Sequence, residues 1–134
     1  MALSASRDLS HYVDQELRTY KVKGSTTIYK GALVGLSSGY ARGLVAADKF
    51  VGIAYEEVVN AGADGAKEIR VYTLGDFEHA LSGVAQSNVS SAVYSSDDGT
   101  LTLTASGNSF VGILIGVPAS GVALVRIDPA HSAL

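Results

Sequence analysis

Short apolar or alternating runs, separated by polar and glycine-rich breaks, fill the chain from Arg18 onward. Val, Ile, Thr and Tyr are frequent in these runs, and such branched and aromatic side chains suit the pleated, half-buried surface of a sheet. Strands are expected at residues 18–23, 26–29, 32–37, 50–58, 67–73, 76–81, 92–95, 100–104, 110–117 and 121–128. The sequence therefore predicts an all-β fold.

The breaks between these runs have the composition of turns. Asp98-Gly99 precedes Thr-Leu-Thr-Leu-Thr, which is a strong hairpin signal because glycine supplies the positive φ of tight turns. Alternation within 67–73 places Ile69, Val71 and Thr73 on one face, which predicts that this face meets the core.

An internal repeat organises the runs. Phe50-Val51-Gly52-Ile53 recurs as Phe110-Val111-Gly112-Ile113, at an offset of 60 residues. The same offset places the turn 37–39 over the turn 97–99, and an offset of 56 places Ile69-Arg70-Val71 over Val125-Arg126-Ile127. A matched turn, motif and strand in the same order predict a duplicated β unit, at about 29–73 and 89–128, joined by 74–88.

The run 110–117 is apolar on both faces. Such a strand is either central and covered twice, or covered by another subunit. A subunit interface is therefore expected at Phe110, Ile113, Leu114 and Ile115.

The first 24 residues differ from the rest, because they are polar, charged and free of glycine before Gly24. Leu9, Val13 and Leu17 are spaced for one face of a short helix, which Asp8 or Ser10 could cap. Alternatively, the segment is an extended arm that orders against a partner. We expect an N-terminal arm at 1–24 and a single β domain at 25–134.

The arm carries aromatic and basic side chains together. This combination could bind single-stranded nucleic acid, could reflect strand residues on alternate faces, or could lie across a protein partner, where Tyr and Arg are favoured anchors. The third reading is favoured. The candidate contact residues are Arg7, Leu9, Tyr12, Val13, Leu17, Arg18, Tyr20, Lys21 and Lys23.

Charge and composition narrow the function classes. The 134 residues fit one domain, and the formal net charge of −3 gives no general attraction to nucleic acid. Residues 1–30 carry five basic and three acidic groups, or +2, so the remainder carries −5. Cysteine is absent, and the longest apolar stretch is shorter than the ~20 residues of a spanning helix. No membrane association is expected.

Candidate chemistry is sparse. His11, His79 and His131 lack metal-ligand spacing, and Glu78 and His79 are adjacent and should point to opposite faces of a strand. Asp97-Asp98-Gly99 is better explained as a turn than as a calcium loop, and Glu56-Glu57 as a solvated strand end. We expect no catalytic, cofactor or metal site, no small-molecule substrate, and no enzymatic activity.

Several short motifs carry a resemblance to a known family. They are Tyr20 to Val34, Ser38-Gly39-Tyr40-Ala41, Phe50 to Ala54, Ile69-Arg70-Val71, Gly75 to Glu78, Val93-Tyr94, Asp97 to Thr100, and Val111-Gly112-Ile113. In this order they resemble the capsid decoration, or cement, proteins of tailed bacteriophages, of the lambda-like head decoration type. The resemblance covers about residues 20–128.

The resemblance implies a compact β-barrel-like or β-tulip-like fold, a homotrimer, and a place on the outer capsid surface of the virion after synthesis in the host cytoplasm. It implies that the N-terminal arm contacts the major capsid protein and that binding stabilises the mature shell. Residues 1–19 match nothing in the family pattern. The alternative is another virion or surface module, such as a tail or head-fibre component, with carbohydrate as a possible ligand.

Overall fold

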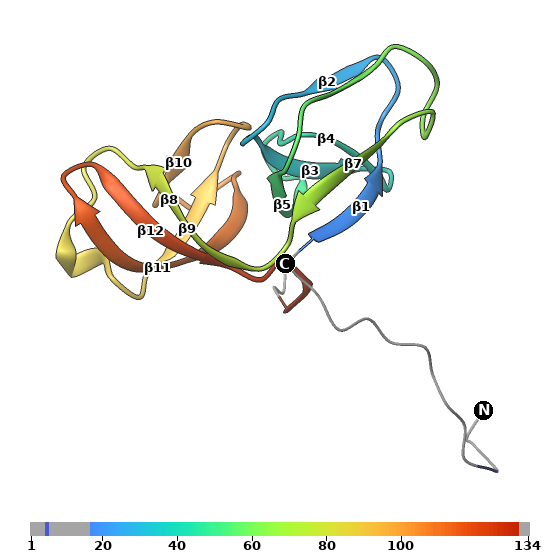
Figure 1. Cartoon of the computed structure of the whole chain (residues 1–134). Helices are drawn as coiled ribbons and strands as arrows, with labels where there is room; N and C mark the ends of the chain where they lie inside the picture. The colour runs from blue at the N-terminus through green and yellow to red at the C-terminus, as the bar shows by residue number, and fades with distance from the viewer. Residues whose placement is uncertain (1–4, 6–16, 132–134) are drawn as a thin grey trace.

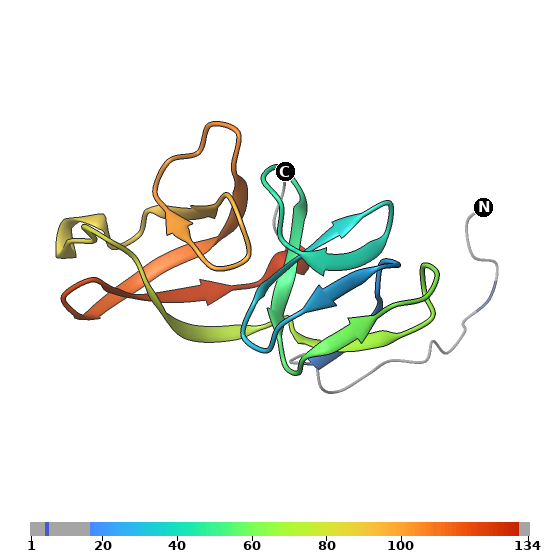
Figure 2. The same cartoon turned by 90° about the horizontal axis from the view of Figure 1, so that it is seen from above.

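The computed structural model describes Ala5 and residues 17–131, which form two lobes built almost entirely of strands (Figure 1). The chain passes from one lobe to the other between β7 and β8 (Figures 1 and 2). The strands are β1 (Leu17–Lys21), β2 (Thr26–Ile28), β3 (Leu33–Ser37), β4 (Tyr40–Gly43), β5 (Lys49–Ala54), β6 (Val58–Asn60), β7 (Glu68–Tyr72), β8 (Gly75–Ala80), β9 (Ala92–Ser95), β10 (Leu101–Thr102), β11 (Ser109–Ala119) and β12 (Val122–Ile127), with short 3-10 turns η1 (Gln86–Asn88) and η2 (Pro129–His131). The predicted all-β class is confirmed.

The two lobes repeat one sheet. The first sheet has the order β1-β7-β5-β3-β4 and the second β8-β12-β11-β9-β10, and every ladder is antiparallel. Each strand of the first sheet thus has a counterpart in the second. We call residues 17–73 the first unit and residues 75–128 the second unit.

The repeated tetrapeptide makes the same irregularity in both sheets. Val34 pairs with Gly52 and Gly35 with Phe50, which leaves Val51 as an extra residue. In the second unit Val93 pairs with Gly112 and Tyr94 with Phe110. One extra residue in one strand of an antiparallel pair is a β-bulge, which bends the strand. The repeat therefore encodes a bulge as well as two strands.

Alignment of the two ladders corrects part of the predicted repeat. Ile53 pairs with Tyr72, and Ile113 pairs with Arg126, so the offset after the motif is 54 and not 56. The offset falls from 60 to 54 because the stretch from Ile53 to Tyr72 in the first unit is six residues longer than the stretch from Ile113 to Arg126 in the second. The units also begin earlier than predicted, since β1 and β8 are counterparts at one edge of each sheet.

Each sheet has an inner face, and the two inner faces are covered differently. In the first unit Val34, Val51, Ile69 and Val71 pack with Ile28, which comes from the short ribbon that β2 forms with β6. A single parallel bridge between Val22 and Ala41 also draws the edge strands β1 and β4 together. The sheets stay open at their edges otherwise, so the expected barrel is not closed.

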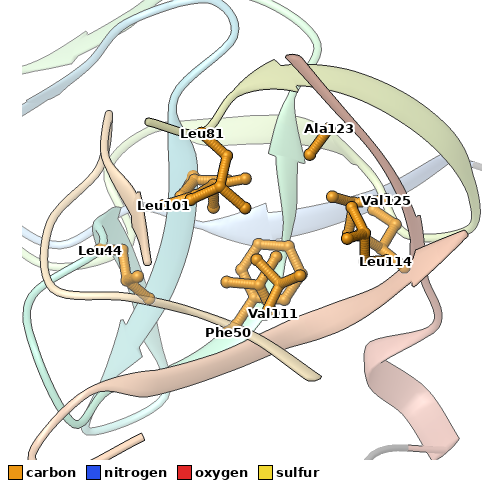
Figure 3. Close-up of a cluster of buried hydrophobic side chains, with 11 residues drawn as sticks. Leu44, Phe50, Leu81, Leu101, Val111, Leu114, Ala123 and Val125 are labelled. Atoms are coloured by element: carbon orange, nitrogen blue, oxygen red, sulfur yellow. The ribbon is translucent and has the colours of Figure 1, made fainter. Parts of the chain in front are cut away.

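The inner face of the second unit is covered by the first unit itself. Four buried residues of the second unit are equivalent to Val34, Val51, Ala54 and Val71 of the first unit. They are Val93, Val111, Leu114 and Val125. The same cluster contains Leu33 of β3, Phe50 of β5 and Leu44, which directly follows β4. Figure 3 shows Leu44 and Phe50 beside Val111 and Leu114. Phe50 is 1% exposed. The outer face of the first sheet thus covers the hydrophobic core of the second unit.

The boundary of the N-terminal segment differs from the prediction. Leu17 to Lys21 form β1, which pairs along its whole length with β7. Residues 17–21 of the expected arm are therefore an edge strand of the first sheet, and Leu17 lies in this strand and not at the end of a helix. The expected helix over Leu9 and Val13 lies outside the described residues.

Candidate functional site

Ion pairs between arginines and carboxylates stand out among the ionisable groups in the described part of the chain. Residues 17–131 hold no group of three His, Cys, Asp or Glu side chains that could bind a metal ion. Three arginines form two-pronged ion pairs, Arg42 with Asp48, Arg70 with Glu56 and Arg126 with Asp76. Arg126 and Asp76 lie on neighbouring strands, whereas Asp48 and Glu56 lie in connections, so each pair fixes a local contact between a strand and its neighbour.

The acidic partners of these pairs are stabilised as carboxylates. Hydrogen bonds from Arg70 lower the pKa of Glu56 below its ordinary value. Arg126 does the same to the pKa of Asp76. A carboxylate with a depressed pKa makes a poor general acid or base near neutral pH. Glu56 pairs with Arg70 at the surface and Glu57 beside it is exposed, in the connection between β5 and β6.

Two of the remaining sequence candidates, His79 and Asp97, lie close to backbone groups. Glu78 is exposed and His79 is half-buried on the other face of β8, as alternation predicts. The His79 ring nitrogen Nδ1 lies 2.9 Å from the carbonyl oxygen of Ala80. Asp97 accepts a hydrogen bond from the N–H of Gly99 at 2.9 Å, which closes the predicted turn between β9 and β10.

The larger cavity lies beside β1. Its volume is about 570 Å³, and Arg18, Tyr20, Lys49, Thr73 and Asp128 contribute polar groups to its lining. Leu36, Val51, Leu74, Pro129 and Ala130 complete the walls. Arg18 and Tyr20 are the two predicted contact residues that the structure brings to one concave surface. Lys49 donates a hydrogen bond to the carbonyl oxygen of Pro129, so a contact of the C-terminal turn shapes this cavity.

The other predicted contact residues are separated from this cavity or lie outside the described part. Lys21 is exposed at the end of β1, and Lys23 follows it at a half-buried position. Leu17 is half-buried at the start of the strand. Arg7, Leu9, Tyr12 and Val13 lie outside the described residues.

A smaller aromatic depression lies at the boundary of the two units. It measures about 370 Å³ and is lined by Ile53, Tyr55, Tyr72 and Phe77 together with Lys30, Gly31 and Ala54. The ring centroids of Tyr55 and Tyr72 are 5.3 Å apart, and those of Tyr72 and Phe77 are 5.6 Å apart. Edge-to-face contacts of this kind stabilise neighbouring rings, so the row ties the two units together.

The outer face of the second sheet carries several apolar and aromatic side chains. Val93 and Ser95 are buried inward, so Ala92 and Tyr94 point outward. Tyr94 pairs with Phe110, and their ring centroids are 5.8 Å apart. Ile113, which is 39% exposed, lies further along β11. We call Ala92, Tyr94, Phe110, Ile113 and Leu124 the outer patch.

The outer patch contains two of the four predicted interface residues. Phe110 is half-buried and Ile113 exposed, so both are available to a partner. Leu114 is wrong as an interface residue, because it is fully buried in the core of its own chain. Ile115 is half-buried where the register between β11 and β12 shifts. The apolar run 110–117 therefore has one face in the core and one at the surface.

Three members of the outer patch were missed by the sequence analysis. Ala92 and Tyr94 lie in the predicted strand 92–95, and Leu124 lies in the predicted strand 121–128. Alternation with the buried Val93 and Val125 would have placed all three on the face opposite the core. The missing information was which strands are neighbours of β11.

No protein-family model matches the chain, and no curated protein sequence matches it. Among solved structures, the chain is similar to the head fibre gp8.5 N base of bacteriophage phi29. The TM-score is 0.55 and the sequence identity 15%, and the match covers 84% of this chain and 95% of that chain. The two proteins share a fold. No described helix could cross a membrane, since none is long or apolar enough.

Proposed function

We propose that this chain is a structural protein of a phage virion that binds the outside of the head. The observation that carries the proposal is the fold shared with the base of a phage head fibre over nearly the whole of that base. The motif resemblance to capsid decoration proteins, which concerns residues 20–128, supports the same location independently of the fold.

The surface of the molecule supports a binding role better than a catalytic role. In residues 17–131 three arginine–carboxylate ion pairs connect a strand to a neighbouring strand or turn, and one cavity opens beside an edge strand. Catalysis needs titratable groups that converge on one reacting atom. Binding to a repeated shell needs a stable body and a modest contact, because many weak contacts made together become strong.

Two placements on the head fit this proposal. A decoration protein covers the capsid lattice and stabilises the mature shell, with residues 1–30 and the cavity beside β1 as its contact with the major capsid protein. A head-fibre base, favoured by the shared fold, anchors a projecting structure. In both, the chain acts as a homo-oligomer, and a trimer is what the resemblance to decoration proteins implies.

Mixing the purified chain with expanded, undecorated capsids tests the proposal. Co-sedimentation with the shells is expected, and electron microscopy should then locate the chain on the outer surface. Occupancy of the whole lattice with a gain in heat resistance identifies a decoration protein. Occupancy of isolated positions without such a gain identifies a fibre base. Failure to bind shells, together with localisation to the tail of intact virions, would contradict both.

A further inference from the structure

The strand β8 forms an open edge of the second sheet. It pairs with β12 from Gly75 to Ala80 in one continuous register. No described strand pairs with its other side, because β8 is the last strand in the order of this sheet. An edge strand presents a row of backbone N–H and C=O groups to which a further strand can bond. The second sheet can therefore be extended at β8.

The register identifies the backbone groups that point away from the sheet. The N–H of Leu81 donates to the carbonyl oxygen of Gly121 at 2.9 Å, directly after the ladder ends. Bonded and non-bonded pairs alternate along an antiparallel ladder, so every second residue of β8 bonds to β12. The residues whose N–H and C=O groups point outward are Asp76, Glu78 and Ala80. The carbonyl oxygen of Ala80 already lies 2.9 Å from the ring nitrogen Nδ1 of His79.

The other sheet edges are shorter or partly covered. β10 has two residues and β4 has four. The end of β1 is tied to β4, because the N–H of Lys23 donates to the carbonyl oxygen of Ala41 at 2.9 Å. Short and covered edges limit pairing with other chains. β8 has six residues without proline, lysine or a bulge, so it is the longest open edge in the part of the chain that the structure describes.

The side chains of β8 favour one kind of incoming strand. Asp76 is neutralised by Arg126, whose guanidinium nitrogens lie 2.7 and 3.0 Å from the carboxylate oxygens. Glu78 is exposed and pairs in the ladder with the apolar Leu124. A basic side chain on an added strand would match Glu78, whereas antiparallel pairing of two β8 strands about residue 78 would oppose two glutamates. The edge therefore fits a basic segment better than a second copy of itself.

The open edge adjoins the cavity beside β1. Leu74 lines this cavity, is 39% exposed and directly precedes β8. Asp128 and Pro129, which also line the cavity, follow β12, the neighbour of β8. A strand added to β8 would therefore have one end beside the cavity that the proposed function already assigns to the shell contact.

We infer, on the basis of the proposed function, that β8 receives an extended segment of the capsid shell as an additional strand of the second sheet. The outward backbone groups of Asp76 and Glu78 supply hydrogen bonds, which give affinity in strand addition. Glu78 on one face and the half-buried Phe77 on the other select a segment in which basic and apolar side chains alternate.

Amide hydrogen exchange of the wild-type chain tests this contact. In the free chain the amides of Asp76, Glu78 and Ala80 should exchange faster than those of Phe77 and His79, which bond to β12. Binding to expanded, undecorated capsids should slow the first three about tenfold or more. Shell binding that leaves them fast would refute the inference and keep the proposed function, whereas a chain that binds no shell would refute both. Protection in the concentrated free chain would assign the edge to a second copy and overturn the inference.

Glu78→Pro blocks the open edge and leaves the β8–β12 ladder complete. The N–H of residue 78 points outward, and edge strands tolerate proline at such positions. This variant should keep the circular dichroism spectrum of the wild type and bind shells about tenfold or more weakly. Glu78→Gln is the matched control, since it keeps the N–H group and should lose less binding. A folded Glu78→Pro variant that binds shells as the wild type does would contradict strand addition, and if this variant unfolds, the exchange experiment decides.

Discussion

At the scale of single residues, the two bulge glycines have the clearest structural requirement. A Cβ at Gly52 would lie 2.0 Å from the carbonyl oxygen of Tyr72, and a Cβ at Gly112 would lie 2.2 Å from that of Arg126. Both oxygens belong to the neighbouring strand of the sheet, so they cannot move aside without disturbing a ladder. The glycine of the repeated tetrapeptide is therefore required by close backbone packing in both units.

Gly112→Ala should lower the free energy of unfolding by about 1–3 kcal/mol, the usual cost of forcing extra atoms into a packed site. Gly99→Ala is the control, because a Cβ there would meet nothing within 4 Å and φ is not left-handed. That variant should be as stable as the wild type or slightly more so, since alanine restricts the unfolded chain. Urea unfolding measures both. Equal losses in the two variants would contradict the packing requirement.

The turn after β4 depends on the carboxylate of Asp48. Asp48 accepts hydrogen bonds from Arg42 at 2.8 and 3.0 Å and from the N–H of Val45 at 3.1 Å. Burial alone would raise the pKa of Asp48, but these hydrogen bonds and the charge of Arg42 together bring it below its ordinary value.

The depressed pKa of Asp48 predicts a loss of stability in acid. An aspartate whose pKa is lower in the folded state stabilises the fold above its unfolded pKa of about 3.9, and this contribution is lost as the pH falls through the folded pKa. Asp48→Asn should therefore be less stable at pH 7 and lose less stability below about pH 4. Urea midpoints between pH 7 and pH 3 give the comparison, with Glu57→Gln as an exposed control. Parallel curves for Asp48→Asn and the wild type would refute this role.

At the scale of elements, periodicity and turn residues predicted most of the strands. The expected strand 92–95 matches β9 residue for residue, and most others end within one or two residues of the structure. β4 has no counterpart among the expected strands, because it is short and ends in glycine. The expected strand 50–58 covers most of β5 and the first residue of β6, because the exposed Tyr55 and Glu57 between them do not interrupt the alternation strongly.

The candidate site was predicted less completely, for a physical reason. The sequence pattern marks β11 as apolar on both faces but does not say which face meets the core. That choice depends on the bulge at Val111, which shifts the register and turns Leu114 inward. It also depends on strand neighbours such as β9 and β12, whose contacts are long-range. The predicted interface therefore included one core residue and omitted Tyr94 and Leu124.

The N-terminal boundary of the sheet predicts different effects for two truncations. Removal of residues 1–16 leaves every described strand intact, so a chain of residues 17–134 should fold with the thermal midpoint of the full chain. Removal of residues 1–21 also deletes β1, which would expose the edge of β7 and the buried Ile69 beside it. This shorter chain should be markedly less stable in thermal melts followed by circular dichroism. Equal midpoints for the two truncations would show that β1 is dispensable.

The same truncations test the arm. The chain of residues 17–134 should bind shells more weakly than the full chain, because Arg7, Leu9, Tyr12 and Val13 are then absent while the cavity lined by Arg18 and Tyr20 remains. Co-sedimentation with undecorated capsids measures the difference. Undiminished binding would assign the shell contact to the folded body and would remove residues 1–16 from the proposed interface.

At the scale of the whole molecule, two equivalent phenylalanines occupy different environments. Phe50 is buried in the core that joins the units, whereas Phe110 is half-buried on the outer patch. Phe50→Ala should cost about 3–5 kcal/mol of stability, as is usual for a large core side chain. Phe110→Ala should cost clearly less, because the ring of Phe110 is only half-buried. Urea unfolding at low protein concentration gives both values, and equal costs would contradict the shared core.

The cover over the inner face of the first unit has a further consequence. A contact between unlike faces can in principle repeat without end, and such contacts build filaments when the rotation does not close a ring. Here Ile28 of the β2–β6 ribbon occupies the inner face of the first unit, and the first unit itself occupies the inner face of the second. Among the described residues, no inner face is left to receive the outer patch of another molecule. This contact between unlike faces therefore cannot repeat from copy to copy, and concentrated solutions should not grow fibres through it.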